Sequence, residues 1–460
     1  MEYEELIQEL AAEGANVTSI HGLAILATLL TGFLLLRLPR RDALAALLTA
    51  CILIPFGQRI VIGGFDFMMI RILILFGCAR MLRSAPEDRP VWTPIDKVFL
   101  AWVAAMAVIY VLLWHRGDAL TNRLGFAFTA IGVYAIFRFF VRDFDDVQRI
   151  FRVLAVMSII VGVFIAREWL TQRNIFYVFG GVPEFTEIRD GKLRCQGPFA
   201  HALLAGSFGA ACFPASFALW WQGGKGKMLG LAGCLSAICI ALGSSSSGPL
   251  LSLLAAVVAL AMWKVRHRMN QIRWGLAGLL VCLHLVMEAP VWALPHKIKI
   301  FGASSGFHRF ELVDNFIRRV DEWSLLGTKS TMHWGEAMGY MDLWDVSNYF
   351  VSVGVKGGLL SLILFFVLLT LCFKAIGEIR NAVLENEACS IRTWCLGSML
   401  FAMVVSFWGV VYFDQMQCIW YMTLAIVASV RSRASQPTTS QTALESGAPH
   451  VPFASFELNS

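Results

Sequence analysis

Three short polar segments of this 460-residue chain hold residue types that could bind an anion or move a proton. The first is RCQGPFAH (residues 194–201), which runs directly into the small-residue stretch ALLAGSFGAA. Arg194 offers a planar fork of donors that fits phosphate oxygens. An arginine that only extends its charge to a membrane interface gives the same pattern, so the segment by itself leaves both readings open.

The second segment is GSSSSGP (residues 243–249), in which four hydroxyls lie between Gly and Pro. Gly and Pro favour a tight turn. The hydroxyls, that of Ser247 among them, could hold a phosphate or a sugar. A polar turn between two apolar runs needs no ligand to explain it, and these residues alone do not separate the two readings.

The third segment is DLWDVSNY (residues 342–349), which stands directly before a long apolar run. It places the carboxylates of Asp342 and Asp345 and the amide of Asn348 where a loop enters that run. Ionisable groups so close to hydrocarbon are costly, so they indicate a partner or a function. The Trp and Tyr of the segment are expected in any interfacial belt.

The third segment closes the stretch 293–348, which is too long for a mere connection. The middle of this stretch, FHRFELVDNFIRRVDEW (307–323), has apolar residues at i, i+3, i+6, i+7 and i+10, which predicts an amphipathic helix. The stretch also holds His308, Arg309 and His333. It is either a solvated cap or a lid over a catalytic site.

The elements that must position these residues are membrane helices. The chain is 57% hydrophobic and only 15% charged, with a mean hydropathy of +0.65, whereas soluble proteins carry about 25% charged residues. Runs of about 17–25 apolar residues cross a bilayer as helices. The expected fold class is therefore an all-α polytopic membrane protein with 12–13 transmembrane helices, the second and third runs being short. The predicted spans are 20–37, 42–56, 67–82, 98–114, 124–141, 150–170, 202–221, 228–243, 249–264, 274–292, 349–373, 394–412 and 417–430.

Basic residues predict the orientation of these spans, because Lys and Arg gather in cytoplasmic loops. The acidic N-terminus and the loops 171–201 and 293–348 then face outward, and the net charge of +6 reflects topology instead of a nucleic-acid surface. Most of the 11 cysteines lie inside apolar runs, and no Cys/His spacing suggests a metal. The basic connections are 37–41, 80–89, 225–227, 264–273 and 431–433.

Taken together, the motifs resemble the O-antigen ligase and O-antigen polymerase superfamily of bacterial inner-membrane glycan transferases. The order is similar: many spans, an Arg-x-x-Gly-x-Phe-x-His element (194–201), a Ser-rich turn two spans later, and a long outer loop. That loop carries SGFHR (305–309) and LLG (325–327). An early GQRIVIGG (57–64), followed by Arg71 in the next span, also looks familiar.

Two positions depart from the family pattern. The outer loop closes on Ser347-Asn348, with Gly358 nine residues further on, where the family typically has His in place of Ser347. At the Ser-rich turn the family usually shows Ser-Arg-Gly, and Ser247 here replaces the Arg. The missing His leaves open whether the chain uses another base, and it favours a polymerase over a ligase.

The resemblance implies a metal-independent glycosyl transfer at the periplasmic face of the bacterial inner membrane, with no cofactor and no nucleic-acid partner. The donor would be a glycan on undecaprenyl pyrophosphate. The acceptor would be a second lipid-linked repeat for a polymerase, or lipid A core for a ligase. Further partners would be membrane lipids and other proteins of polysaccharide assembly and export. The divisions would be a periplasmic N-terminal segment (1–19), membrane helices (20–292, with the periplasmic loop 171–201), a periplasmic catalytic loop (293–348), membrane helices (349–430) and a disordered cytoplasmic tail (431–460).

The resemblance also implies roles for single residues. Cations must offset the charge that grows on the leaving pyrophosphate, and a base must take the proton of the acceptor. Asp345, next to the vacant His position, is the nearest candidate base. The residues expected to bind the pyrophosphate are Arg194, Arg309, His201 and Ser247, with Arg309 also counted as catalytic. Further candidates are His308, His333 and Asn348 as polar groups, and Trp334, Trp344 and Tyr349 as platforms for sugars.

Two other classes of function stay open. A transporter for lipid-linked sugars predicts charged residues well inside the spans, of which few are evident beyond Arg71, Arg152, His284 and Glu288. A structural partner of an envelope complex would need none of the proposed chemistry.

Overall fold

The computed structural model describes most of the membrane region and part of the long outer loop. Asp342, Trp344, Asp345 and Glu288 lie outside the described residues, as do most of the predicted N-terminal segment and tail. The described residues are 18, 20–62, 65–85, 89–189, 191–287, 290–293, 304–335 and 346–434.

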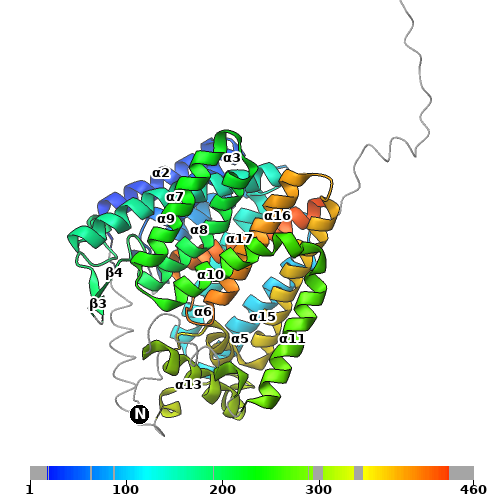
Figure 1. Cartoon of the computed structure of the whole chain (residues 1–460). Helices are drawn as coiled ribbons and strands as arrows, with labels where there is room; N and C mark the ends of the chain where they lie inside the picture. The colour runs from blue at the N-terminus through cyan, green and yellow to red at the C-terminus, as the bar shows by residue number, and fades with distance from the viewer. Residues whose placement is uncertain are drawn as a thin grey trace, which may run out of the picture.

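The molecule is an all-α polytopic membrane protein, as predicted (Figure 1). Each predicted span overlaps one helix. Within the described residues, eight helices are long and apolar enough to cross a membrane, with α10 and α11 counted as one through the turn η4 (Met262–Arg268). The helices of the spans are α2 (Gly22–Arg37), α3 (Arg40–Leu53), α4 (Met69–Leu82), α5 (Pro94–Trp114), α6 (Gly117–Phe140), α7 (Phe144–Thr171), α8 (Ala202–Gln222), α9 (Lys227–Gly243), α10 (Ser247–Ala261), α11 (Met269–Val286), α15 (Tyr349–Ala382), α16 (Glu387–Ser406) and α17 (Asp414–Ala434).

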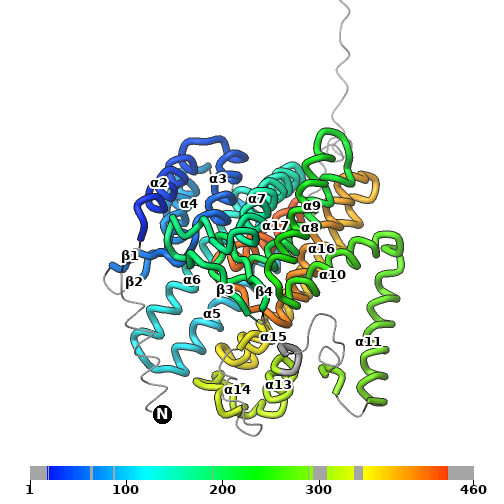
Figure 2. The backbone as a smooth tube through the Cα atoms, turned by 60° about the vertical axis from the view of Figure 1, so that its left-hand side comes forward, coloured from blue at the N-terminus to red at the C-terminus, as the bar shows by residue number. Residues whose placement is uncertain are grey.

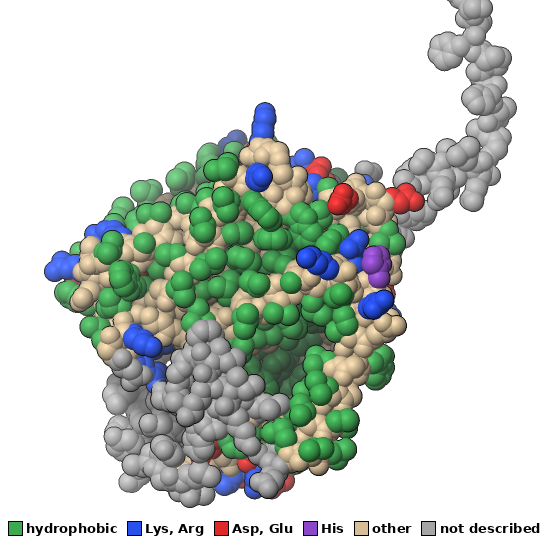
Figure 3. Space-filling model, in the orientation of Figure 1, with side chains coloured by type: hydrophobic (Ala, Val, Ile, Leu, Met, Phe, Trp, Pro, Cys, Tyr) green, Lys and Arg blue, Asp and Glu red, His purple; other side chains and the backbone are tan. Residues whose placement is uncertain are grey.

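Apolar side chains cover much of the middle of the face drawn in Figure 3, and charged side chains lie mostly around its margin. This distribution is typical of a surface that contacts lipid. Two of the shorter helices, α3 and α4, have 14 residues each. At 1.5 Å per residue each rises about 21 Å, which is less than the hydrocarbon layer. The connections around them must therefore enter the membrane region.

Helix α8 is the central helix of one half of the bundle, and small residues let its neighbours approach closely. A Cβ on Gly206 would lie 2.5 Å from Ser244 Oγ, and a Cβ on Gly209 would lie 2.6 Å from the Ala237 carbonyl. Small residues serve this purpose in membrane helix pairs. The small-residue run that follows His201 is thus explained by packing alone.

The end of the bundle that carries the loops 37–41 and 431–433 is here called the basic end. Buried ion pairs close it. Arg138 donates to both oxygens of Asp96, at 2.9 Å and 3.1 Å, and Tyr134 donates to the same carboxylate at 2.6 Å. Asp96 also closes a capping box with Thr93 at the start of α5.

The opposite end, here called the loop end, carries residues 304–335. This segment forms α13 (Ser304–Arg318), α14 (Val320–Trp323) and the short turn η6 (Met332–Trp334). Figure 2 shows α13 and α14 directly below the first residues of α15. The amphipathic helix predicted over 307–323 is present, although its apolar face is covered only in part. Leu312, Val313 and Phe316 are buried, whereas Ile317 and Val320 are exposed.

The loop end also holds two short antiparallel hairpins. Strands β1 (Arg59–Ile62) and β2 (Phe65–Met68) pair ahead of α4, with Arg59 opposite Met68. Strands β3 (Glu187–Arg189) and β4 (Lys192–Arg194) pair ahead of α8. The first hairpin runs directly into α4, whereas residues 195–201 separate the second hairpin from α8.

Helix α15 is broken at Gly358, whose φ of 64° and ψ of −176° are not helical. The outer loop fills the break: Leu359 N–H donates to the Ser324 carbonyl at 2.7 Å, and Thr328 N–H donates to the Val355 carbonyl at 2.9 Å. A Cβ on Gly358 would lie 2.6 Å from the Leu325 carbonyl oxygen. The LLG turn and Gly358, two pieces of the resemblance, therefore contact each other.

Candidate functional site

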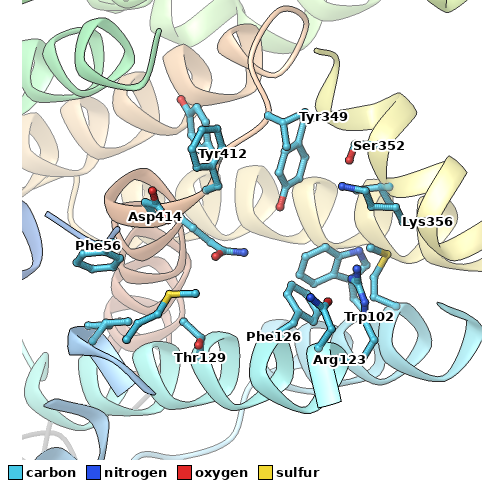
Figure 4. A pocket seen from close by; sticks show the side chains of 18 of the residues that line it. Phe56, Trp102, Arg123, Phe126, Thr129, Tyr349, Ser352, Lys356, Tyr412 and Asp414 are labelled. Carbon is cyan, nitrogen blue, oxygen red and sulfur yellow. The ribbon is translucent and has the colours of Figure 1, made fainter. Parts of the chain in front are cut away.

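A cavity of about 330 Å³ lies at the loop end, between the first turns of α4, α15 and α17 and the facing sides of α5 and α6 (Figure 4). We call it the loop-end cavity. Its walls combine aromatic rings with a few charged groups, as ligand sites usually do. Its lining includes Phe56, Arg71, Trp102, Arg123, Phe126, Tyr349, Lys356, Tyr412, Phe413 and Asp414.

Two cations of the loop-end cavity have no counter-charge in the described part of the chain. The guanidinium of Arg123 lies 3.6 Å from the centre of the Tyr110 ring, and its Nε has no hydrogen-bond partner. Lys356 lies in the membrane helix α15, yet its side chain is exposed, because it faces the cavity. No described carboxylate lies within ion-pair distance of Arg123 or Lys356.

Arg71 differs from these two cations because it is paired. It donates to both the backbone and the side chain of Asp66, and its Nε donates to Thr129 Oγ1 at 3.2 Å. A Cβ on Gly125 would lie 2.5 Å from its terminal nitrogen, so the glycine makes room for the guanidinium. Arg71 therefore lines the cavity as a fixed, partly neutralised charge.

The aromatic walls are held by stacking. Tyr349, the first residue of α15, stacks on Phe407 with ring centres 4.6 Å apart. Trp102 meets Phe126 edge to face at 6.0 Å. Because these rings are packed on their far sides, they present rigid faces to the cavity. Of the aromatic residues predicted as platforms for sugars, Tyr349 lines the cavity.

Arg194, the first predicted pyrophosphate ligand, has a partner within its own hairpin. It donates to Glu187 at 3.2 Å and is not a lining residue of the loop-end cavity. The next residue, Cys195, donates its N–H to the Gly243 carbonyl at 3.0 Å, so the first and second polar motifs lie side by side. Burial raises the pKa of the Cys195 thiol to about 12, which leaves it an inert core group.

His201 is the N-cap of α8: its Nδ1 accepts the N–H of Leu203 at 3.1 Å. Asn348 caps α15 in the same way, because its Oδ1 accepts the N–H groups of Phe350 and Val351. Asn348 also donates to the Trp408 carbonyl. The N-cap position explains why each of these polar residues is present, because an N-cap fixes where its helix begins.

Arg309, the second predicted pyrophosphate ligand, donates to Ser247 Oγ at 3.3 Å, so these two predicted site residues do meet. A Cβ on Gly409 would lie 2.9 Å from the guanidinium carbon of Arg309, so the glycine makes room for this side chain. Burial lowers its pKa. Arg309 and Arg194 have different described partners, and neither lines the loop-end cavity.

The remaining histidine candidates lie in the outer loop. His333 Nε2 lies 2.8 Å from Glu322, which also accepts hydrogen bonds from Trp334 and Arg319. His308 lies close enough to Glu311 to stabilise its charge. Both histidines thus have carboxylate neighbours within the loop. Asp345 lies outside the described residues, and its role as the base stays a prediction.

The predicted motifs support one wall of the loop-end cavity from behind. The segment 407–413 joins α16 to α17 and contributes Tyr412 and Phe413 to the lining. Arg309 lies against Gly409 of this segment, and the side chain of Gln415 just beyond it donates to the Pro198 carbonyl at 2.7 Å. The first two motifs and Arg309 therefore lie behind this wall, whereas Tyr349 of the third motif and Arg71 line the cavity itself.

Sequence reasoning passed over Arg123 and Lys356. The signal for Lys356 was present, since it is a lone cation within the apolar run 349–373. Arg123 stands one residue before the predicted span 124–141 and so resembled a loop cation. No group of three or more His, Cys, Asp and Glu residues that could hold a metal occurs among the described residues.

No protein-family model matches this sequence, and no curated protein matches it significantly. The motifs alone therefore carry the resemblance to glycan ligases and polymerases.

Proposed function

We propose that this protein polymerises undecaprenyl-pyrophosphate-linked oligosaccharide repeats into an exopolysaccharide or O-antigen, as a metal-independent glycosyltransferase of the bacterial inner membrane. The loop-end cavity holds the donor pyrophosphate, and its aromatic walls hold the sugars next to it. Other proteins of polysaccharide assembly and export are the expected partners.

The observation that carries this proposal is that two cations in the loop-end cavity have no ion-pair partner among the described residues. A charge inside a membrane protein is costly unless it is paired or faces water. Arg123 and Lys356 face the same cavity without a described carboxylate beside them. An anionic ligand supplies the missing counter-charge, and a pyrophosphate supplies more than one.

The surroundings of these cations suit a lipid-linked sugar. The cavity is lined by Trp102, Phe126 and Tyr349, whose faces can stack on sugar rings. It lies at the end of the bundle that the basic-loop pattern predicts to face outward. Preorganised cations at such a site stabilise the charge that develops on a leaving pyrophosphate.

The test is chain elongation by purified protein in liposomes with lipid-linked repeats. Removing one preorganised donor of a developing charge lowers turnover by about 10²-fold. We therefore expect losses of that order for Lys356→Gln and for Arg123→Gln, with normal amounts of folded protein. Lys374→Gln is the matched control, because Lys374 lies on the same helix and is exposed, 3.9 Å from Glu378. Full elongation by Lys356→Gln and Arg123→Gln would contradict the proposed site, and transfer to lipid A core instead of elongation would identify a ligase.

A transporter of lipid-linked sugars is the second candidate. The cations within the spans and the broken helix α15 favour it, because discontinuous helices often line transport sites. Against it, the charges at the basic end are engaged in buried pairs such as Arg138 with Asp96. Passage of intact repeats across the liposome membrane, with no change in their length, would favour the transporter over the polymerase.

A further inference from the structure

Asp414 is the one carboxylate among the described residues that line the loop-end cavity. It is the first residue of α17 and is partly buried. In the described part of the chain it has no ion-pair partner, and no hydrogen bond reaches its side chain. Asp66, whose partner Arg71 lines the cavity, is not itself a lining residue and is bound to that arginine.

The carboxylate and the unpaired cations stand apart. Figure 4 shows Asp414 on one side of the cavity, with Tyr412 and Phe56, and Lys356 and Trp102 on the other side. Opposite charges that face one cavity without forming a pair leave room for a ligand between them. The cations then face the anionic part of that ligand, and the carboxylate faces the part that carries a proton.

The position of Asp414 is fixed by its neighbours. Its backbone φ of 48° lies in the left-handed region, which residues other than glycine adopt uncommonly. The next residue, Gln415, is fully buried and donates to the carbonyls of Pro198 and Ile54. Such conformations persist where the surroundings impose them, and they are frequent at active sites. A carboxylate can also stabilise a helix N-terminus, so an experiment must separate that effect from catalysis.

We infer that Asp414 is the general base of the transfer, an inference that rests on the proposed function. The acceptor hydroxyl oxygen forms a bond to the anomeric carbon of the donor glycan. The bond from that carbon to the pyrophosphate oxygen breaks, and undecaprenyl pyrophosphate leaves with the electron pair. The hydroxyl proton passes to the Asp414 carboxylate and from there to water. Asp414 thus takes the role for which the family pattern has a His and this chain has Ser347.

The experiment compares Asp414→Asn, Asp414→Ala and Asp414→Glu with wild type. General-base catalysis contributes about 10²–10⁴-fold. We expect Asp414→Asn to lose elongation by a factor in that range while it binds undecaprenyl pyrophosphate as wild type does, measured by fluorescence of the tryptophans, Trp102 among them. Added formate should restore part of the turnover of Asp414→Ala, and Asp414→Glu should retain part of it. Asp118→Asn is the control, because Asp118 is exposed at the start of α6.

Three results would count against this assignment in distinct ways. Near-normal elongation by Asp414→Asn excludes Asp414 as the base while leaving the proposed function intact. An equal loss of binding and of turnover, without rescue by formate, assigns Asp414 to structure or donor binding. A wild-type protein that binds no undecaprenyl pyrophosphate and elongates nothing removes the proposed function itself, and the base with it.

Discussion

Individual charged residues behave differently at the two ends of the bundle. At the basic end, Arg138 satisfies its guanidinium with Asp96, Ser429 and the Val91 carbonyl. At the loop end, Arg123 rests on the Tyr110 ring with its Nε unpaired. The first arrangement is typical of a structural ion pair. The second leaves a hydrogen-bond donor and a positive charge free to bind an anionic ligand.

The pair at the basic end predicts a large loss of stability for Asp96→Asn. Both side chains are nearly fully buried, so the change leaves Arg138 charged without a counter-ion. Breaking a buried pair in this way costs about 3–5 kcal/mol. The measurement is thermal unfolding in detergent. Asp145→Asn is the control: the Asp145 side chain is 72% exposed, 3.5 Å from Arg392, and such pairs contribute about 1 kcal/mol or less. Equal effects of the two changes would show that the buried pair is not structural.

Glu322 predicts a pH dependence for the outer loop. Burial raises its pKa, but hydrogen bonds from Trp334, His333 and Arg319 outweigh burial and hold it below its ordinary value of 4.5. A carboxyl whose folded pKa is depressed stabilises the fold above its unfolded pKa and loses that effect as the pH falls through the folded pKa. At neutral pH, Glu322→Gln should therefore be cut several-fold faster within 304–335 by a protease, and the difference from wild type should shrink below pH 4.5. A difference that does not depend on pH would point to packing instead of charge.

Among the elements, α15 links the outer loop to the loop-end cavity. Its first nine residues, 349–357, carry Tyr349 and Lys356 to the cavity wall, and its break at Gly358 is filled by residues 324–328. Gly354 provides a second contact, because a Cβ there would lie 2.5 Å from the Phe316 ring of α13. The cavity wall and the outer loop therefore hold each other in place.

This link predicts the effect of Gly358→Ala. The added Cβ would lie 2.6 Å from the Leu325 carbonyl, and the φ of 64° is strained for alanine. We expect a cost of about 1–3 kcal/mol, seen as faster proteolysis of 304–335 and a loss of elongation. Gly377→Ala on the same helix is the control, because a Cβ there meets nothing within 4 Å. It should be neutral or stabilising by up to about 1 kcal/mol. Normal elongation by Gly358→Ala would show that the cavity does not need the docked loop.

At the scale of the whole molecule, the basic connections predict that the loop end faces outward and the basic end faces the cytoplasm. Reporter fusions at 268 and 433 should therefore read cytoplasmic, and fusions near 185 and 325 should read periplasmic. A cytoplasmic signal near 325 would contradict the proposed function, because the donor pyrophosphate has to reach the loop end from outside.

The helices were predictable because a bilayer imposes length and apolarity on every helix that crosses it. The predicted number of 12–13 spans exceeds the eight described helices that are long and apolar enough to cross a membrane. The caps were visible only as polar residues: His201 and Asn348 looked like site residues, although each is the N-cap at which a helix begins. The cavity could not be predicted, because Arg123 and Lys356 are 233 positions apart and face one cavity only because α5 packs against both α6 and α15. The spacing of residues within one segment of the sequence carries no information about which distant residues share a cavity.

The break in α15 also bears on how the chain enters the membrane. Residues 324–328 leave the ribosome before Gly358, so in the orientation that the basic loops predict, the groups that complete the broken helix are translocated before the helix is made. The nine residues 349–357 are far fewer than the roughly 20 that span a bilayer on their own, whereas the part of α15 after Gly358 is long enough to do so. Insertion of α15 is therefore expected to depend on the part after Gly358. Residues 349–357, which carry Tyr349 and Lys356, are expected to take their final position only when the loop closes onto the break.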